Sequence, residues 1–239
     1  MFNTTQSRLQ RLAAVAATLA TTLMLSQAAS ATLIDPTTWS GCVGSSSCVI
    51  GNAGLSALPS GRTFEQKTVA GQTGLGISGL TAGEVDIGEM FNVNYGVSET
   101  IDAIRIVFIF NGPEFNDVAE IARVTVNGGA SYTLSVSGTV DNIASWSGAG
   151  GSVVSCGATT AAGSGCLDIL NPFGGSLVNS LSFTAITGGT PMAGTGTNQS
   201  DYAIGSIRGA QAVPEPDTIV LLGAGFLGLG LLRRRRAAA

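Results

Sequence analysis

The sequence predicts an all-β protein, an antiparallel β-sandwich or jelly roll flanked by an N-terminal signal helix and a C-terminal transmembrane helix. Three observations support this fold class. Segments of strand length that alternate or run apolar recur along the middle of the chain, and clusters of Gly, Ser, Asn and Pro separate them. No helical period in this part persists beyond about ten residues. The roughly 180 residues between positions 32 and 212 are enough for the core of two packed sheets.

Four segments carry the strand prediction. Residues 85–95 alternate, with their odd-numbered side chains, Val85 to Tyr95, expected on one face. Residues 104–110 form a nearly continuous β-branched and aromatic run, which is typical of a buried central strand. Residues 176–186 and 201–208 give two further strands, the second of them the last before the C-terminal segment.

A hairpin is expected over residues 123–136. Asn127-Gly128 is a turn pair that accepts positive φ, and apolar residues alternate on both sides of it. We expect one helical turn over residues 117–123. Residues 144–165 are mostly Gly, Ser and Ala and are predicted to form a long loop.

The N-terminal segment, residues 1–31, is predicted to be a signal peptide. Arg8 and Arg11 precede an apolar run over residues 12–25, and the small-residue pattern Ala29-Ser30-Ala31 follows it, so cleavage is expected before Thr32. The alternative is an uncleaved membrane helix, but the run has about 14 residues where a span needs about 20. The implied partners are the Sec translocon and signal peptidase.

The four cysteines fall into two local groups, and export makes disulfides chemically possible. Four cysteines permit three pairings. Short loops close at little entropic cost, so we favour Cys42–Cys48 and Cys156–Cys166, each closing a loop rich in Gly and Ser. A zinc site of four cysteines is the rival interpretation, although neither spacing is the tight one usual for zinc ligands.

The C-terminal segment has three parts in a fixed order. Residues 213–216 are expected to form a stiff, extended segment, because each proline fixes φ and restrains the residue before it. Residues 219–232 carry no charged or polar side chain, and four arginines follow them: Arg233, Arg234, Arg235 and Arg236. Such a cationic block favours the cytoplasmic face of a membrane and stops transfer. We therefore predict a transmembrane segment over residues 218–232 with the preceding domain outside.

These three parts resemble the PEP-CTERM sorting signal, also labelled an ice-binding protein C-terminal motif. The motif residues are Pro214, Glu215 and Pro216, followed by the Gly-rich apolar run and the arginine block. The resemblance is limited to residues 213–236. It implies recognition by an exosortase, a transpeptidase-like membrane enzyme, in Gram-negative bacteria that make extracellular polysaccharide. It also implies removal of the tail. A plain membrane anchor is the alternative, but such an anchor needs no Pro-Glu-Pro segment before its apolar run.

Charge and composition exclude several functions. Residues 32–212 contain five basic and 13 acidic residues, a net charge of −8, which disfavours nucleic-acid binding. The chain has no histidine, so a Ser-His-Asp or Cys-His arrangement cannot exist. Two groups of acids, Glu84, Asp86 and Glu89 and then Glu114, Asp117 and Glu120, are interpreted as solvated surface. Calcium binding or glycan hydrolysis are the alternatives.

The three domains are therefore a signal peptide (1–31), a secreted β-sandwich domain (32–212) and the sorting signal (213–239). We expect no catalytic residue, no metal site and no cofactor. The favoured function is that of an exported surface or matrix protein, first an inner-membrane-anchored precursor and then at the cell surface or extracellular, near polysaccharide. The alternative is a secreted module that binds carbohydrate or Ca²⁺, or, less favoured, hydrolyses glycans. A groove lined by Trp39, Trp146 or two facing carboxylates would favour this alternative.

Overall fold

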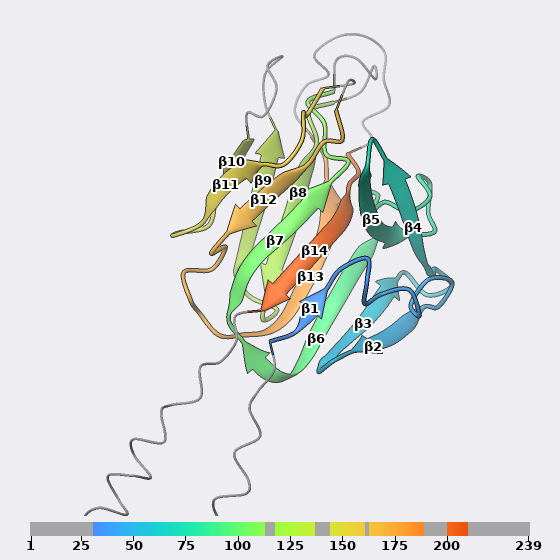
Figure 1. Ribbon diagram of the computed structural model, residues 1–239, viewed down its shortest axis with the longest axis vertical. Helices are drawn as coiled ribbons and strands as arrows, with labels where there is room; N and C mark the ends of the chain where they lie inside the picture. Colours follow the sequence, from blue (N-terminus) through green and yellow to red (C-terminus); the bar gives the residue numbers. More distant parts are fainter. Residues whose placement is uncertain (1–30, 113–117, 137–143, 161–162, 189–199, 210–239) are drawn as a thin grey trace, which may run out of the picture. The chain divides into compact units, whose positions relative to one another are not determined.

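Two antiparallel sheets face each other around a common core in the computed structural model, which describes residues 31–112, 118–136, 144–160, 163–188 and 200–209 (Figure 1). The pairings between the named strands of these ranges are all antiparallel. Contacts group residues 31–211 into one compact unit. The predicted all-β fold class is confirmed, with a sandwich-like arrangement.

The first sheet is built around β14 (Ala203–Gly209), the last described strand. Its order is β11 (Ser152–Ser155), β12 (Leu167–Leu170), β7 (Ile101–Val107), β14, β5 (Gln72–Ile77) and β4 (Phe64–Val69). The two-residue strand β1 (Leu33–Ile34) also pairs with β14. Strands from both ends of the unit thus lie side by side.

The second sheet is built around β13 (Val178–Ile186). Its order is β10 (Ala144–Trp146), β9 (Ser131–Val136), β8 (Ile121–Val126), β13, β6 (Met90–Glu99), β3 (Ala53–Leu58) and β2 (Ser47–Ile50). Strand β13 pairs with β8 on one edge and β6 on the other, so segments far apart in the sequence form the middle of this sheet.

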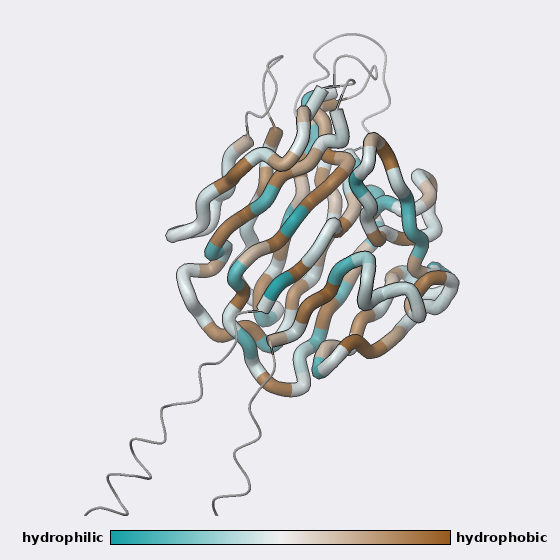
Figure 2. The backbone as a smooth tube through the Cα atoms, in the orientation of Figure 1, coloured by the Kyte–Doolittle hydropathy of each residue, from teal (hydrophilic) through white to brown (hydrophobic). Residues whose placement is uncertain are grey.

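The inner faces of the two sheets meet in an aromatic core. Phe64 of the first sheet lies 5.1 Å from Phe91 of the second between ring centroids, and Phe91 lies 6.0 Å from Phe183 in the same sheet. All three rings are buried. Along the strands, hydrophobic and hydrophilic positions alternate (Figure 2). This period of two is the pattern expected when one face of a strand is packed against another sheet.

The predicted hairpin is present as β8 and β9. Asn127 and Gly128 have φ of 53° and 65°, the left-handed values that the turn requires. The Asn127 side chain also fixes the turn against the neighbouring strand, because its Oδ1 accepts hydrogen bonds from the amides of Asn179 (2.7 Å) and Ser180 (3.1 Å). The asparagine therefore serves both turn geometry and sheet packing.

The predicted strand over residues 85–95 is wrong in its first half. Strand β6 begins only at Met90, and Ile87, expected on one face with Val85 and Glu89, is 44% exposed whereas those two are buried. The preceding backbone has another partner: the Val85 amide donates to the carbonyl of Tyr202 at 2.6 Å. Tertiary contacts with the start of β14 thus override the local alternation.

Two other expectations are corrected. The segment expected to be one long loop, residues 144–165, contains the short strands β10 and β11. The helical turn expected over residues 117–123 is wrong where it is described, because β8 begins at Ile121. Both segments have weak local preference and take strand geometry from a neighbouring strand.

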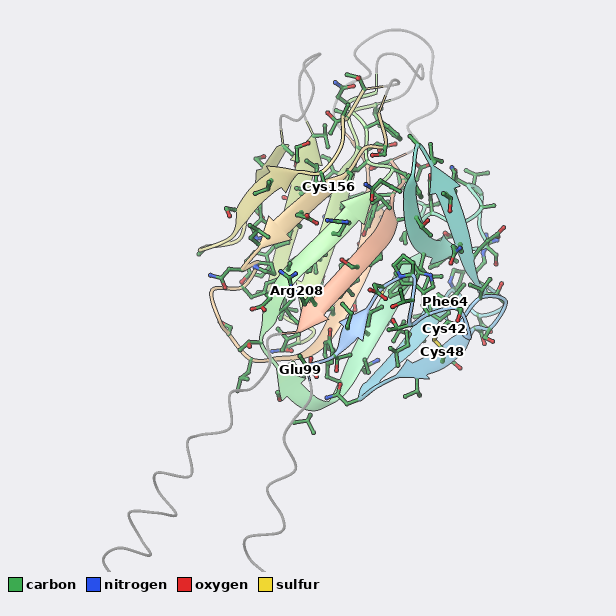
Figure 3. All side chains as sticks on the ribbon, in the orientation of Figure 1. Cys42, Cys48, Phe64, Glu99, Cys156 and Arg208 are labelled. Carbon is green, nitrogen blue, oxygen red and sulfur yellow. A yellow bond between two sulfur atoms is a disulfide. The ribbon has the colours of Figure 1, made fainter. Side chains whose placement is uncertain are left out.

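The structure contains both favoured disulfides, Cys42–Cys48 and Cys156–Cys166, with Cα–Cα distances of 5.3 and 4.9 Å. Figure 3 places the first beside Phe64. Cys42 joins the main core, and Cys166 belongs to a second, smaller apolar cluster with Val107, Phe108 and Ala203. The bridges therefore add buried apolar surface as well as closing short loops.

The signal peptide apart from Ala31, and the transmembrane segment 218–232, lie outside the described residues. Within the part of the chain that is described, no helix has the length and apolar character needed to cross a membrane.

The core predicts the effect of truncating its central ring. Phe91→Ala removes a fully buried side chain that contacts rings in both sheets, and should lower the free energy of unfolding by about 3–5 kcal/mol. Urea denaturation followed by tryptophan fluorescence measures this change. The control is Val97→Ala on the same strand; Val97 is 64% exposed, so the change should stay within about 0.5 kcal/mol. Equal effects of the two variants would contradict the assigned core.

Candidate functional site

A polar groove of about 400 Å³ lies on the first sheet. On β7, the groove residues Ala103 and Arg105 alternate with the core residues Ile104 and Ile106, so the groove occupies the outer face of this sheet. Its lining comes from β1 and the residues after it, the β4–β5 turn, β5, β7, β12 and β14. The lining residues are Leu33, Asp35, Pro36, Gly71, Gln72, Thr73, Ala103, Arg105, Asp168, Leu170, Gly205, Ser206 and Arg208.

An ion pair crosses one side of this groove. Arg105 and Asp168 are directly opposite on β7 and β12, and the guanidinium donates two hydrogen bonds of 2.8 Å to the carboxylate. The hydrogen bond to Asp168 raises the pKa of Arg105 above its usual value. Gly205 on the adjacent strand leaves room for the arginine stem, because a Cβ there would lie 2.6 Å from Arg105 Cγ. The pair is thus held in one orientation.

The other side of the groove carries a cation with no paired acid. Arg208 of β14, labelled in Figure 3, is exposed. It forms no ion pair with any residue that the structure describes. Asp35 is held by the hydroxyl and amide of Thr37, which donate to Oδ1 at 2.6 and 2.9 Å. The groove therefore offers fixed acceptors and an available donor to a ligand rich in hydroxyl groups.

The two tryptophans considered as sugar platforms do not line this groove. Trp39 is fully buried, and its indole N–H donates to Gln66 Oε1 at 2.9 Å. Trp146 donates to the carbonyl of Pro172 at 3.0 Å and packs against Tyr132 and Phe173. Both indoles have a packing role, and the groove residues were not singled out by the sequence because Arg, Asp and Gly occur in many surface strands.

The interpretation of the acidic groups as solvated surface is wrong where the structure describes them. The carboxylates of the first group and Glu120 are all buried: Glu84 is 4% exposed, Asp86 5%, Glu89 4% and Glu120 4%. Glu114 and Asp117 lie outside the described residues. Burial of several acids in an acidic domain requires partners or protons, since an isolated buried charge is unfavourable.

Two of these buried acids, Glu84 and Glu120, form one cluster with Asp201, which directly precedes Tyr202 and β14. The Asp201 carboxyl is hydrogen-bonded to both Glu84 and Glu120. Thr81 Oγ1 donates to Asp201 Oδ2 at 2.8 Å, and Lys67 Nζ lies 2.7 Å from Glu84 Oε1. One lysine thus faces a cluster of three carboxyl groups, Glu84, Glu120 and Asp201.

Burial favours the protonated form of the two glutamates in this cluster. Burial raises the pKa of Glu84 to about 8, with the charge of Asp201 as the second cause. Burial, and then Asp201, also raise the pKa of Glu120, whose Oε2 accepts a hydrogen bond from the Phe110 amide. A carboxyl whose pKa is raised in the folded state contributes stability at low pH. Among the described residues, no group of three or more His, Cys, Asp or Glu side chains has the arrangement of a metal site.

The predicted sorting residues Pro214, Glu215 and Pro216, and the arginine block of Arg233, Arg234, Arg235 and Arg236, lie outside the described residues. In a comparison with protein families, the model of the PEP-CTERM protein-sorting motif matches residues 212–236. The chain is thus an all-β protein with a C-terminal sorting motif. This motif indicates an exported protein that an exosortase processes at the membrane on the way to the surface. No curated protein and no solved structure gives a significant match.

The carboxyl cluster predicts the pH dependence of stability. Because the folded pKa of Glu84 is about 8 against an ordinary 4.5, the folded state binds more protons between these values. The free energy of unfolding should therefore fall as pH rises from 4.5 through about 8. Urea denaturation at several pH values in this window measures the slope.

Removing the central charge should weaken this dependence. In Asp201→Asn, the Coulombic contribution to both glutamates is lost, so the decline with pH should become shallower. Asp102→Asn, at an exposed position of β7, is the matched control and should leave the slope unchanged. A wild-type protein whose stability rises over this window would contradict the assignment.

Proposed function

We propose that the mature β domain is a non-catalytic protein of the cell surface or extracellular matrix that associates with extracellular polysaccharide. The observation that carries the proposal is the sorting motif at residues 212–236, which sets the destination. The polar groove supports the association with polysaccharide.

The order of events follows from the two ends of the chain. The leader directs export through the Sec translocon, and signal peptidase removes it. The apolar run 219–232 then halts in the inner membrane with the arginines on the cytoplasmic side. The stiff segment at Pro214-Glu215-Pro216 presents extended backbone to the exosortase just outside the bilayer. The folded domain reaches the surface after this step.

The groove has the chemistry of a polyol-binding surface. Its walls combine the Arg105–Asp168 pair, the free Arg208 and side-chain hydroxyl and amide groups of Thr73, Ser206 and Gln72. Such groups form hydrogen bonds in pairs with adjacent sugar hydroxyls. A shallow face without aromatic platforms fits weak, repeated contacts along a polymer, where many domains act together.

The second candidate is a secreted module whose main task is to bind a specific carbohydrate. The same groove favours it, and affinity for one defined oligosaccharide would separate it from general matrix association. Hydrolysis of glycans is the less favoured form of this candidate, because Asp168 is bound to Arg105 and the carboxyl cluster does not contribute to the groove lining.

The sorting step is tested by the variant Pro214→Ala/Glu215→Ala/Pro216→Ala. Its backbone loses the proline restraint, so we expect it to stay as a membrane-bound precursor that keeps the arginine block. Cell fractionation with mass spectrometry of the C-terminus measures this. The control Asp217→Asn, directly after the motif, should be processed as the wild type. Normal surface display of the triple variant would contradict the assignment.

The groove is tested by retention on the host's own polysaccharide. Arg208→Ala removes the unpaired cation, and we expect retention of the purified domain to fall about tenfold. Arg123→Ala makes the same change in charge on β8 of the other sheet, where Arg123 is also exposed, and should retain binding. Equal loss in both variants would show attraction by net charge alone, and no loss in either would contradict the groove.

A further inference from the structure

A buried carboxylate receives the first residue of the predicted mature chain. Glu99, at the end of β6, is 9% exposed, and Thr32 is 6% exposed. The Thr32 backbone N lies 3.3 Å from Glu99 Oε2, and Thr32 Oγ1 lies 2.5 Å from Oε1 (Glu99 is labelled in Figure 3). Within the described residues, Glu99 forms no ion pair with a Lys or Arg side chain.

The leader pattern places the cleaved bond directly before Thr32. In the precursor this nitrogen is a neutral amide. Hydrolysis of the Ala31–Thr32 bond adds one water: the leader leaves with a carboxylate on Ala31, and Thr32 keeps the nitrogen, which becomes an α-ammonium at neutral pH. The cation is thus created 3.3 Å from a buried carboxylate.

We propose that removal of the leader forms an ion pair between the new α-ammonium of Thr32 and Glu99, and that this pair locks β1 onto the fold. The structure thereby assigns Glu99 as the receptor for the mature N-terminus. We call this contact the N-terminal latch.

The fold around the latch is built for a close approach. Gly209, the last residue of β14, donates its amide to the carbonyl of Thr32 at 2.9 Å. A Cβ at Gly209 would lie 2.2 Å from Glu99 Oε2, so a larger residue there would displace the Glu99 carboxylate. The latch therefore ties the first strand of the domain to the residue that precedes the segment leading to the sorting motif.

Strand β1 needs such a contact. It has two residues, paired as Leu33 with Arg208 and Ile34 with Ile207, and Ile34 is fully buried in the main core. Two ladder pairs at a chain end are prone to fraying. A carboxylate without a counter-ion is unfavourable when buried, and a cation beside it offsets part of that penalty. Cleavage thus stabilises the pairing of β1 with β14.

Closure of β1 also completes the groove, because Leu33, Asp35 and Pro36 form one of its walls. Any role of the latch in ligand binding rests on the proposed function. The latch itself depends only on export and leader removal, so the two proposals fail separately: polysaccharide retention tests the groove, and the chemistry of the α-amine tests the latch.

The test uses full-length protein exported by expressing cells. Mass spectrometry of the recovered chain should give Thr32 as the N-terminus. The chain has a single lysine, Lys67, which serves as the internal reference for an amine-acylating reagent. In the native wild type, the α-amine should react about tenfold more slowly for each unit by which the pair raises its pKa. Glu99→Gln should restore fast acylation and lower the midpoint of thermal unfolding.

Glu65→Gln, a change of the same type on the half-exposed strand β4, is the control and should behave as the wild type. If Glu99→Gln is not recovered, the wild type alone decides, since its α-amine should be protected in the native state and lose that protection in urea. An N-terminus other than Thr32, or equal acylation of native and unfolded wild type, would overturn the latch. Equal acylation and equal midpoints in wild type and Glu99→Gln would do the same.

Discussion

The pairing of β14 with three other strands is the constraint on which the rest of the domain depends. One edge of β14 pairs with β7, and its other edge is shared by β5 and β1. Its inner side chains Ile204 and Ile207 enter the core, while Arg208 reaches the groove. Asp201 and Tyr202, just before it, hold the carboxyl cluster and the segment at Val85. The last residues before the sorting segment are therefore among the most constrained in the fold.

The sorting motif is separate from the folded β domain. The sorting motif lies at residues 212–236, only a few positions after the end of β14 at Gly209. On the outer face of the first sheet, polar side chains line the groove, whereas Glu84, Glu120 and Asp201 lie buried in one cluster. The sorting motif and the groove thus lie in different parts of one chain.

The sequence predicted what strong local signals encode. The Asn127-Gly128 turn, the first four residues of the apolar run 104–110, which lie in β7, and the two short disulfide loops have preferences that tertiary contacts reinforce. Strands β2 to β5 were not predicted, because their Ser, Gly, Gln, Glu and Lys residues have little strand preference and their geometry comes from paired neighbours. The carboxyl cluster was not predicted either, since it joins Glu84, Glu120 and Asp201 from three distant segments. Sequence spacing carries no information about such contacts.

The central claim is that this chain is exported and processed at both ends, so that only the β domain acts at the surface. Intact-mass measurement of the protein in each fraction of growing cells tests it most directly. The account predicts surface or extracellular material that begins at Thr32 and lacks the four terminal arginines. Soluble cytoplasmic protein that keeps both the leader and the arginine end as the main species would contradict it.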